Sequence, residues 1–207
     1  MLTGKEILNI SPIKQLNLFI IKSLFERWQE EIKKIEVICG PMFAGKTEAL
    51  IGRLTEASKR GARVQIFKPL LDNRYAEEVI MSHNSNSLPA LPVRKAKDIL
   101  SKLDFCDVVG IDEVQFFDEG LINCVNILAN QGKRVVLSGL DMDYLGKPFD
   151  LVARLMSIAE YVTKLQGICT QCGAAAFFSH RLSKSKRKIL LGERKEYEVL
   201  CRACFYD

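Results

Sequence analysis

The fold is decided by one stretch, Gly40-Pro41-Met42-Phe43-Ala44-Gly45-Lys46-Thr47, which follows the pattern G-x-x-x-x-G-K-[ST]. Glycines at both ends let the backbone wrap around a phosphate with its N–H groups pointing inward. In such a loop the lysine neutralises the β- and γ-phosphates, and the hydroxyl of the threonine holds Mg²⁺. The motif needs a strand before it and a helix after it, and the sequence predicts both, at Ile35–Cys39 and Thr47–Arg60. We therefore predict a site for Mg-ATP formed by residues 40–47.

Apolar strands and amphipathic helices alternate around this loop, from residue 35 to residue 166. A long polar loop is predicted over residues 69–92, which contain three prolines. This alternation favours an α/β domain with a mostly parallel sheet covered on both faces, and ligands bind such sheets at the carboxyl ends of the strands. Further strands are predicted at Arg63–Phe67, Asp107–Ile111, Arg134–Ser138 and Tyr161–Leu165, and further helices at Lys95–Leu103, Glu119–Asn130 and Leu151–Ile158.

The chain divides into three predicted parts. Residues 1–34 form an amphipathic helical extension, because apolar residues recur there at steps of three and four between Leu18 and Ile32. Residues 35–166 form the ATP-binding domain. Residues 167–207 form a small unit that four cysteines organise around zinc.

Two carboxylates, Asp112 and Glu113, follow the predicted strand Asp107–Ile111. In a protein with this phosphate-binding loop, an acid at such a position holds the Mg²⁺ shell. Asp112 is the candidate for that role, and Glu113 is the candidate acceptor for the proton of an attacking hydroxyl. Acids are also common at solvated strand ends, but the loop upstream makes that alternative the weaker one.

Two Cys-x-x-Cys pairs lie near the C-terminus, Cys169 with Cys172 and Cys201 with Cys204. Four thiolates close a tetrahedral zinc site and leave no open position, so the predicted zinc is structural. The chain between the pairs is expected to form an extended loop over residues 179–197, tied at its base by the metal. Unrelated thiols are a weaker reading because the two spacings are identical. A redox role is weaker because neither pair is predicted to open a helix after a strand.

Composition and charge limit the other functions. The net charge is +5, but the basic excess lies at the two ends of the chain, and residues 35–166 are close to neutral. The bulk of the protein therefore lacks a nucleic-acid footprint, and the basic run from Arg181 to Lys188 is read as a solvated loop. Cys39, Cys106 and Cys124 stand alone in apolar stretches and are read as buried small hydrophobic residues. A secreted disulfide scaffold would be shorter and denser in cysteine, so we expect a reducing, cytoplasmic setting. No run of residues is apolar and long enough for a membrane span, and no secretory signal is expected.

Further motifs extend the pattern. They are Lys68-Pro69 with Asp72-x-Arg74-Tyr75, Ser82-His83, Ile111-Asp112-Glu113-x-Gln115-Phe116-Phe117, Leu140-Asp141-x-x-Tyr144 and Lys147-Pro148-Phe149. Together with the phosphate loop and the four cysteines, they make residues 35–207 resemble the zinc-containing thymidine kinases, the cellular type shared by bacteria and animals.

This resemblance implies a RecA-like α/β domain with a zinc-stapled lasso that closes over a nucleoside. It implies transfer of the γ-phosphate of ATP to the 5′-hydroxyl of thymidine or deoxyuridine, a homotetramer, and inhibition by dTTP. Glu113 is implied as the catalytic base, and Asp72, Arg74, Asp112 and Gln115 as further parts of the nucleotide site. The residues implied to surround the nucleoside are Met42, Phe116, Leu140, Tyr144, Phe149, Ser179, Ile189, Leu190 and Tyr197.

Two alternatives remain open from the sequence. A P-loop ATPase with a zinc ribbon acting on nucleic acid would use the basic lasso as a polynucleotide contact. A binding module that has lost catalysis is opposed by the presence of Lys46, Thr47, Asp112 and Glu113.

Overall fold

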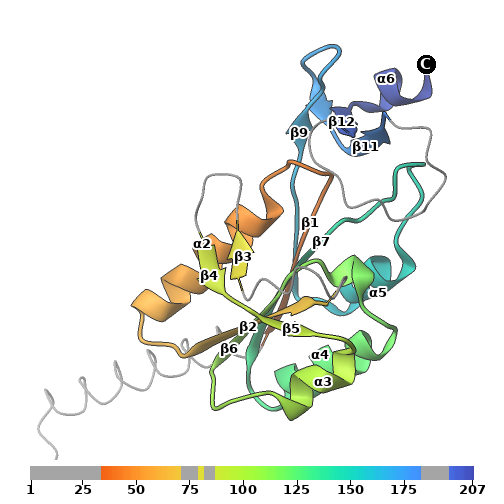
Figure 1. The fold of residues 1–207 in the computed structure, drawn as a ribbon. Helices are drawn as coiled ribbons and strands as arrows, with labels where there is room; N and C mark the ends of the chain where they lie inside the picture. Colours follow the sequence, from red (N-terminus) through yellow and green to blue (C-terminus); the bar gives the residue numbers. More distant parts are fainter. Residues whose placement is uncertain (1–33, 71–78, 82–86, 183–195) are drawn as a thin grey trace, which may run out of the picture.

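The computed structural model describes residues 34–70, 79–81, 87–182 and 196–207, and a six-stranded sheet lies at its centre (Figure 1). The strand order is β5-β2-β6-β7-β1-β8, and every neighbouring pair is parallel. The predicted α/β architecture is therefore confirmed, while the predicted N-terminal helix lies outside the described residues. The strands are β1 Lys34–Cys39, β2 Val64–Pro69, β5 Leu91–Val93, β6 Val108–Ile111, β7 Arg134–Gly139 and β8 Tyr161–Lys164.

Helices cover both faces of this sheet (Figure 1). On one face, α2 (Lys46–Lys59) packs Leu50 and Leu54 against Ile38 of β1. On the other face, α3 (Ala96–Ser101), α4 (Gly120–Asn130) and α5 (Asp150–Ile158) enclose a second cluster that contains Val37. Val37 and Ile38 point to opposite faces because successive strand residues alternate, and both are fully buried. Burial on both faces explains why the parallel strands are continuous apolar runs.

The segment predicted as one long loop over residues 69–92 contains three short strands, so that prediction is wrong. β3 (Val79–Met81) and β4 (Ser87–Pro89) form an antiparallel pair, and β5 extends the central sheet beside β2. Three-residue strands are too short to show a periodic pattern. Pro92 also argues against a strand by composition, but β5 lies at the sheet edge, where a missing N–H is tolerated.

The C-terminal unit, which we define as residues 167–182 and 196–207, lies beyond the carboxyl end of β1 (Figure 1). Within it, β11 (Phe178–Arg181) and β12 (Tyr197–Leu200) are paired antiparallel, with Ser179 opposite Val199. We predicted an extended loop over residues 179–197. This prediction is wrong at both ends of the segment, because those residues belong to the paired strands β11 and β12. The remaining elements are β9 (Gly167–Ile168), β10 (Ala175–Ala176) and α6 (Arg202–Tyr206).

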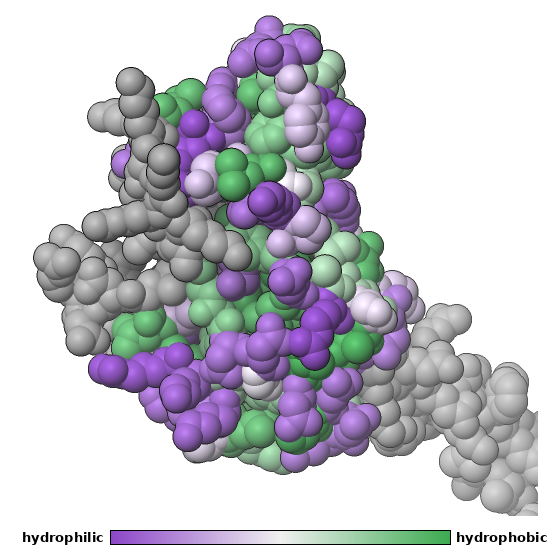
Figure 2. Space-filling model, turned by 90° about the vertical axis from the view of Figure 1, so that its right-hand side faces the viewer, coloured by the Kyte–Doolittle hydropathy of each residue, from purple (hydrophilic) through white to green (hydrophobic). Residues whose placement is uncertain are grey.

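Among the described residues, none of the helices has the length and apolar character required to cross a membrane. On the face shown in Figure 2, hydrophobic residues form small patches separated by hydrophilic ones.

Candidate active site

The loop between β1 and α2 is held close to its neighbours. Gly40 has a φ of +143°, and a Cβ atom there would lie 2.5 Å from the carbonyl oxygen of Leu165. Only glycine therefore fits between this loop and the chain that leaves β8. The ammonium of Lys46 donates to the carbonyl of Pro41 at 2.7 Å, so the lysine folds back over the loop. In such a loop, the backbone N–H groups at the start of the following helix are available to bind phosphate.

Asp112 connects the loop to the neighbouring strands. Its carboxylate is buried at the end of β6 and accepts hydrogen bonds from the Thr47 hydroxyl at 3.2 Å, the Glu113 N–H at 2.9 Å and the Ser138 hydroxyl. Ser138 lies at the end of β7, which pairs with β6. The contact between Thr47 and Asp112 brings together two residues that were assigned to one Mg²⁺ shell from sequence.

Glu113 follows with an unusual backbone. Its φ of +52° lies in the left-handed region, where a residue other than glycine is uncommon. It precedes a short 3₁₀ turn, η1 (Val114–Phe116), and its carboxylate accepts a hydrogen bond from the Gln115 side chain. The Gln115 side-chain oxygen in turn accepts from the Leu140 N–H at 3.0 Å.

The electrostatics of this cluster shift the pKa values of Glu113 and Lys46 toward each other. Burial raises the pKa of Glu113, and the neighbouring Asp112 carboxylate raises it further. Burial lowers the pKa of Lys46, although the charges of Glu113 and Asp112 oppose that shift. A carboxylate with a raised pKa beside a lysine and a phosphate-binding loop is suited to accept a proton.

The C-terminal unit touches this cluster. The Ser179 hydroxyl accepts a hydrogen bond from the Met42 N–H at 2.9 Å. Phe43 packs against Cys169, Ala176, Val199 and Leu200 of the same unit. Both contacts join the phosphate-binding loop to the segment that carries the cysteines.

Arg181 organises two residues of the expected nucleoside set. Its guanidinium lies 3.7 Å from the ring centroid of Tyr144, and it donates to the Tyr197 hydroxyl at 3.0 and 2.7 Å. Arg181 is buried rather than solvated, so its assignment to a solvated basic loop is wrong. The reason is that β11 turns its side chain toward two aromatic rings, which a charge count along the sequence does not reveal.

Some of the other residues expected to contact nucleotide or nucleoside lie near Glu113 and Asp112, and the rest lie outside the described residues. Leu140, Phe116 and Phe149 are half-buried near the ends of β7, β6 and the start of α5. Phe117 is a core residue. Asp72, Arg74, Ile189 and Leu190 lie outside the described residues.

The four predicted cysteine ligands converge. The sulfur atoms of Cys169, Cys172, Cys201 and Cys204 all lie within 4.8 Å of one another, which suits a single tetrahedral metal ion. Burial disfavours the Cys169 thiolate, but backbone N–H groups of Cys201, Cys172 and Gln171 outweigh it and lower the pKa of Cys169 to about 6. A thiolate is the form that binds zinc.

One premise against a redox role is wrong. Cys201 follows β12 and caps α6, so this pair does open a helix after a strand, although the helix has only five residues. The convergence of all four sulfur atoms still favours a metal over a dithiol. His180 is not part of this group, and its Nδ1 lies 2.8 Å from Glu198.

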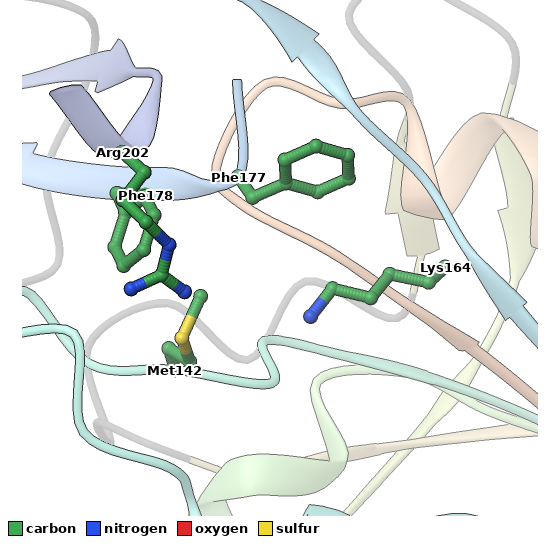
Figure 3. Close-up of a pocket in the computed structure, with 5 residues that line it drawn as sticks. All are labelled: Met142, Lys164, Phe177, Phe178 and Arg202. Atoms are coloured by element: carbon green, nitrogen blue, oxygen red, sulfur yellow. The ribbon is translucent and has the colours of Figure 1, made fainter. Parts of the chain in front are cut away.

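An open hollow lies where the C-terminal unit meets the strand ends, lined by Met142, Lys164, Phe177, Phe178 and Arg202 (Figure 3). None of these residues belongs to the expected nucleotide or nucleoside sets. The Lys164 ammonium lies 2.7 Å from a carboxylate oxygen of Asp141, which is buried. The sequence did not predict this ion pair, although Asp141 belongs to the motif Leu140-Asp141-x-x-Tyr144.

Comparison with known proteins agrees with this geometry. The sequence profile described as thymidine kinase matches residues 33–205. The chain is 51% identical over 172 residues to the thymidine kinase of Bacteroides thetaiotaomicron, covering 83% of this chain and 86% of that protein. It is 50% identical over 171 residues to the thymidine kinase of a Rhodothermus species, covering 83% of this chain and 80% of that protein.

Among solved structures, the flagellar accessory protein FlaH from Methanocaldococcus jannaschii has a TM-score of 0.50 and 13% identity, and the match covers 82% of this chain and 90% of that one. This likeness concerns the fold alone, and it agrees with the predicted α/β architecture. The sequence identities and the matched profile together show that the chain belongs to the thymidine kinase family.

Proposed function

We propose that the protein transfers the γ-phosphate of ATP to the 5′-hydroxyl of thymidine, and also of deoxyuridine. The observation that carries this proposal is the hydrogen bond between Thr47 and Asp112. It holds the phosphate-binding loop against the strand end that carries Glu113, so that one site contains both a triphosphate cradle and a proton acceptor. Membership of the thymidine kinase family supports the choice of substrate.

In the proposed reaction, the 5′-oxygen of the nucleoside forms a bond to the γ-phosphorus, and the bond from that phosphorus to the leaving oxygen of ADP breaks. The proton of the hydroxyl passes to the Glu113 carboxylate. Lys46 and the backbone N–H groups of the loop stabilise the transferred charge. Thr47 and Asp112 would hold Mg²⁺, which neutralises phosphate charge when bound.

The nucleoside pocket is proposed from the family pattern together with the geometry. A flat pyrimidine is well held between aromatic faces. Phe116 lies in η1, Tyr144 in the loop between β7 and α5, and Phe149 at the start of α5. Met42, Leu140, Ser179 and Tyr197 complete the described part of the proposed pocket. Asp72, Arg74, Ile189 and Leu190 are retained as proposed contacts on segments that the structure does not describe.

The cysteine cluster is proposed as a structural zinc site. Four protein ligands leave no position for a substrate, so the metal would stabilise the C-terminal unit rather than take part in chemistry. We also propose the division into residues 1–34, 35–166 and 167–207, a homotetramer, inhibition by dTTP and a cytoplasmic location. The free, buried thiols of Cys39, Cys106 and Cys124 support a reducing setting.

The decisive experiment measures ADP production from Mg-ATP with each of the four common deoxynucleosides and with polynucleotide. We expect thymidine to stimulate turnover, whereas a nucleic-acid ATPase would respond to polynucleotide.

Glu113→Gln is expected to lower kcat by about 10²- to 10⁴-fold while ADP still binds, because only proton acceptance is removed. Glu119→Gln, at an exposed glutamate on the surface, is the matched control and should keep full rate. Full activity of Glu113→Gln would refute the assignment of the base.

A further inference from the structure

The side-chain amide of Gln115 joins Glu113 to the chain that follows β7. Its nitrogen donates to the Glu113 carboxylate, and its oxygen accepts from the Leu140 N–H at 3.0 Å. Gln115 is 8% exposed, so these bonds form in a largely water-free setting, where an unmade hydrogen bond is costly.

The orientation of this amide follows from its two partners. A carboxylate can only accept hydrogen bonds, and a backbone N–H can only donate. Turning the amide by 180° would place its oxygen against the Glu113 carboxylate and its NH₂ group against the Leu140 N–H. Both contacts would then be repulsive, so the amide has one stable orientation.

The backbone leaves room for this arrangement. A Cβ atom at Gly139 would lie 2.6 Å from the Gln115 side-chain oxygen and 2.7 Å from Cγ2 of Val114. Val114 is fully buried in the core, and η1 therefore rests directly on the end of β7. The absence of a side chain at residue 139 allows the amide to reach Leu140.

We propose that Gln115 is a positioning residue, which holds the Glu113 carboxylate in its reactive orientation and does not bind the nucleotide itself. This inference rests on the proposed kinase function and deepens it. The resemblance to the family placed Gln115 in the nucleotide site, but both ends of its amide are engaged within the protein. The same amide also ties Glu113 to Leu140, which borders the proposed nucleoside pocket.

The physical role is orientation. A glutamate side chain has several rotatable bonds, and a displacement of about 1 Å at a reacting group can cost about a hundredfold in rate. The hydrogen bond from Gln115 restricts the carboxylate to one position near the Lys46 ammonium, whose charge Glu113 stabilises. Loss of this bond should therefore reduce turnover more than binding.

The test replaces Gln115 by methionine, which has similar length and lacks the amide. We expect Gln115→Met to lower kcat for thymidine by about tenfold to a hundredfold, with the KM for ATP and the affinity for ADP changed less than twofold. The matched control is Gln65→Met, because the Gln65 amide also bridges two partners, in this case both backbone groups: the Lys102 carbonyl at 3.0 Å and the Asp104 N–H at 2.8 Å. That variant should keep wild-type kcat.

A double-mutant cycle separates positioning from a general structural effect. In a Glu113→Ala background, Gln115→Met should cause less than a twofold further loss of kcat, because Gln115 acts through the carboxylate that is already missing. An equal loss in both backgrounds would overturn the proposal, and so would a large loss of ADP affinity in Gln115→Met. If the methionine variant does not fold, Gln115→Asn, which is too short to span both partners, replaces it in the same cycle.

Failure of this inference is distinguishable from failure of the proposed function. Wild-type protein that does not phosphorylate thymidine would refute the function. Crystal structures then still test the positioning, because Gln115→Met should displace the Glu113 carboxylate and leave the backbone of residues 112–116 in place. An unmoved carboxylate would refute the positioning whatever the substrate is.

Discussion

Glu113 combines a left-handed backbone with a half-buried carboxylate beside a second acid. Such a conformation typically costs about 1–3 kcal/mol and persists only where the surroundings determine it. Here Glu113 lies between β6 and η1, and its N–H donates a hydrogen bond to the Asp112 carboxylate. At the residue scale, the sequence predicted which side chains carry the proposed chemistry, but not this conformation, which depends on packing between β6 and β7.

Some residues of the cluster were not predicted, for physical reasons. Ser138 carries a weak signal, since it closes one predicted strand and Asp112 directly follows another, and parallel strands align their carboxyl ends. Lys164 and Asp141 carry no such signal, because their ion pair depends on β8 lying beside β1. Arg181 looked like part of a basic run, and only its pairing in β11 buries it.

Gly139→Ala is predicted to destabilise the protein. The added Cβ would overlap the Gln115 side chain and Cγ2 of Val114, and overpacking of this kind typically costs about 1–3 kcal/mol. Urea unfolding followed by circular dichroism measures the change. Gly52→Ala, on an exposed part of α2 with open space around the new atom, is the control and should be stabilising by roughly 0.5–1 kcal/mol. Equal stability of the two variants would contradict the tight packing at η1.

At the scale of elements, the strongly periodic segments were predicted well and the short ones were not. The helix α2 and the strands β1, β6 and β7 lie within one or two residues of their predicted bounds. Their long apolar patterns and end signals are local properties of the chain. By contrast, β5 forms a strand because it pairs with β2 at the edge of the sheet. The strands β11 and β12 form because they pair with each other. Such pairing is not encoded in a local pattern.

The junction of β2 and β6 carries an ion pair that makes stability depend on pH. The Arg63 guanidinium donates to both oxygens of Asp107, at 2.9 and 2.7 Å. These hydrogen bonds lower the pKa of Asp107 to about 2, below its ordinary value of 3.8. Because the folded-state pKa is depressed, the stabilisation is complete above about pH 4 and is lost as the pH falls from there toward 2.

Asp107→Asn is therefore predicted to lower the free energy of unfolding at pH 7 by about 1 kcal/mol or less, since the pair is partly exposed. The difference from wild type should shrink between pH 4 and pH 2. Urea titrations at pH 7 and at pH 2.5 measure both values. Glu56→Gln, which removes the exposed pair with Arg60 on α2, should have a smaller effect. A difference that stayed constant with pH would rule out the ion pair as its source.

At the scale of the whole molecule, one unit is built around cysteines because it has little core of its own. Its buried cluster contains Cys169, Ala176, Val199 and Leu200, far fewer residues than either cluster of the central sheet. A segment with so small a core needs a staple. The sequence predicted the staple from the spacing of the cysteines, but not the paired strands that the staple holds.

Removal of the metal with a chelator is predicted to abolish thymidine binding and to increase amide hydrogen exchange in residues 167–207, while the central sheet stays protected. Without the metal, the small buried cluster of this unit offsets less of the entropy lost when the unit becomes ordered. Calorimetry with thymidine and hydrogen-exchange mass spectrometry measure the two effects, with re-addition of zinc as the control. Unchanged thymidine affinity in metal-free protein would refute the proposed structural role of the site.

The contacts from Met42 and Phe43 to the C-terminal unit connect the phosphate-binding loop to the cysteine cluster. If order at the cysteines favours the shape of the loop that receives triphosphate, then thermodynamic reciprocity requires that bound triphosphate strengthen the hold on the metal by the same factor. A chelator would then remove zinc less completely from ATP-saturated protein than from nucleotide-free protein.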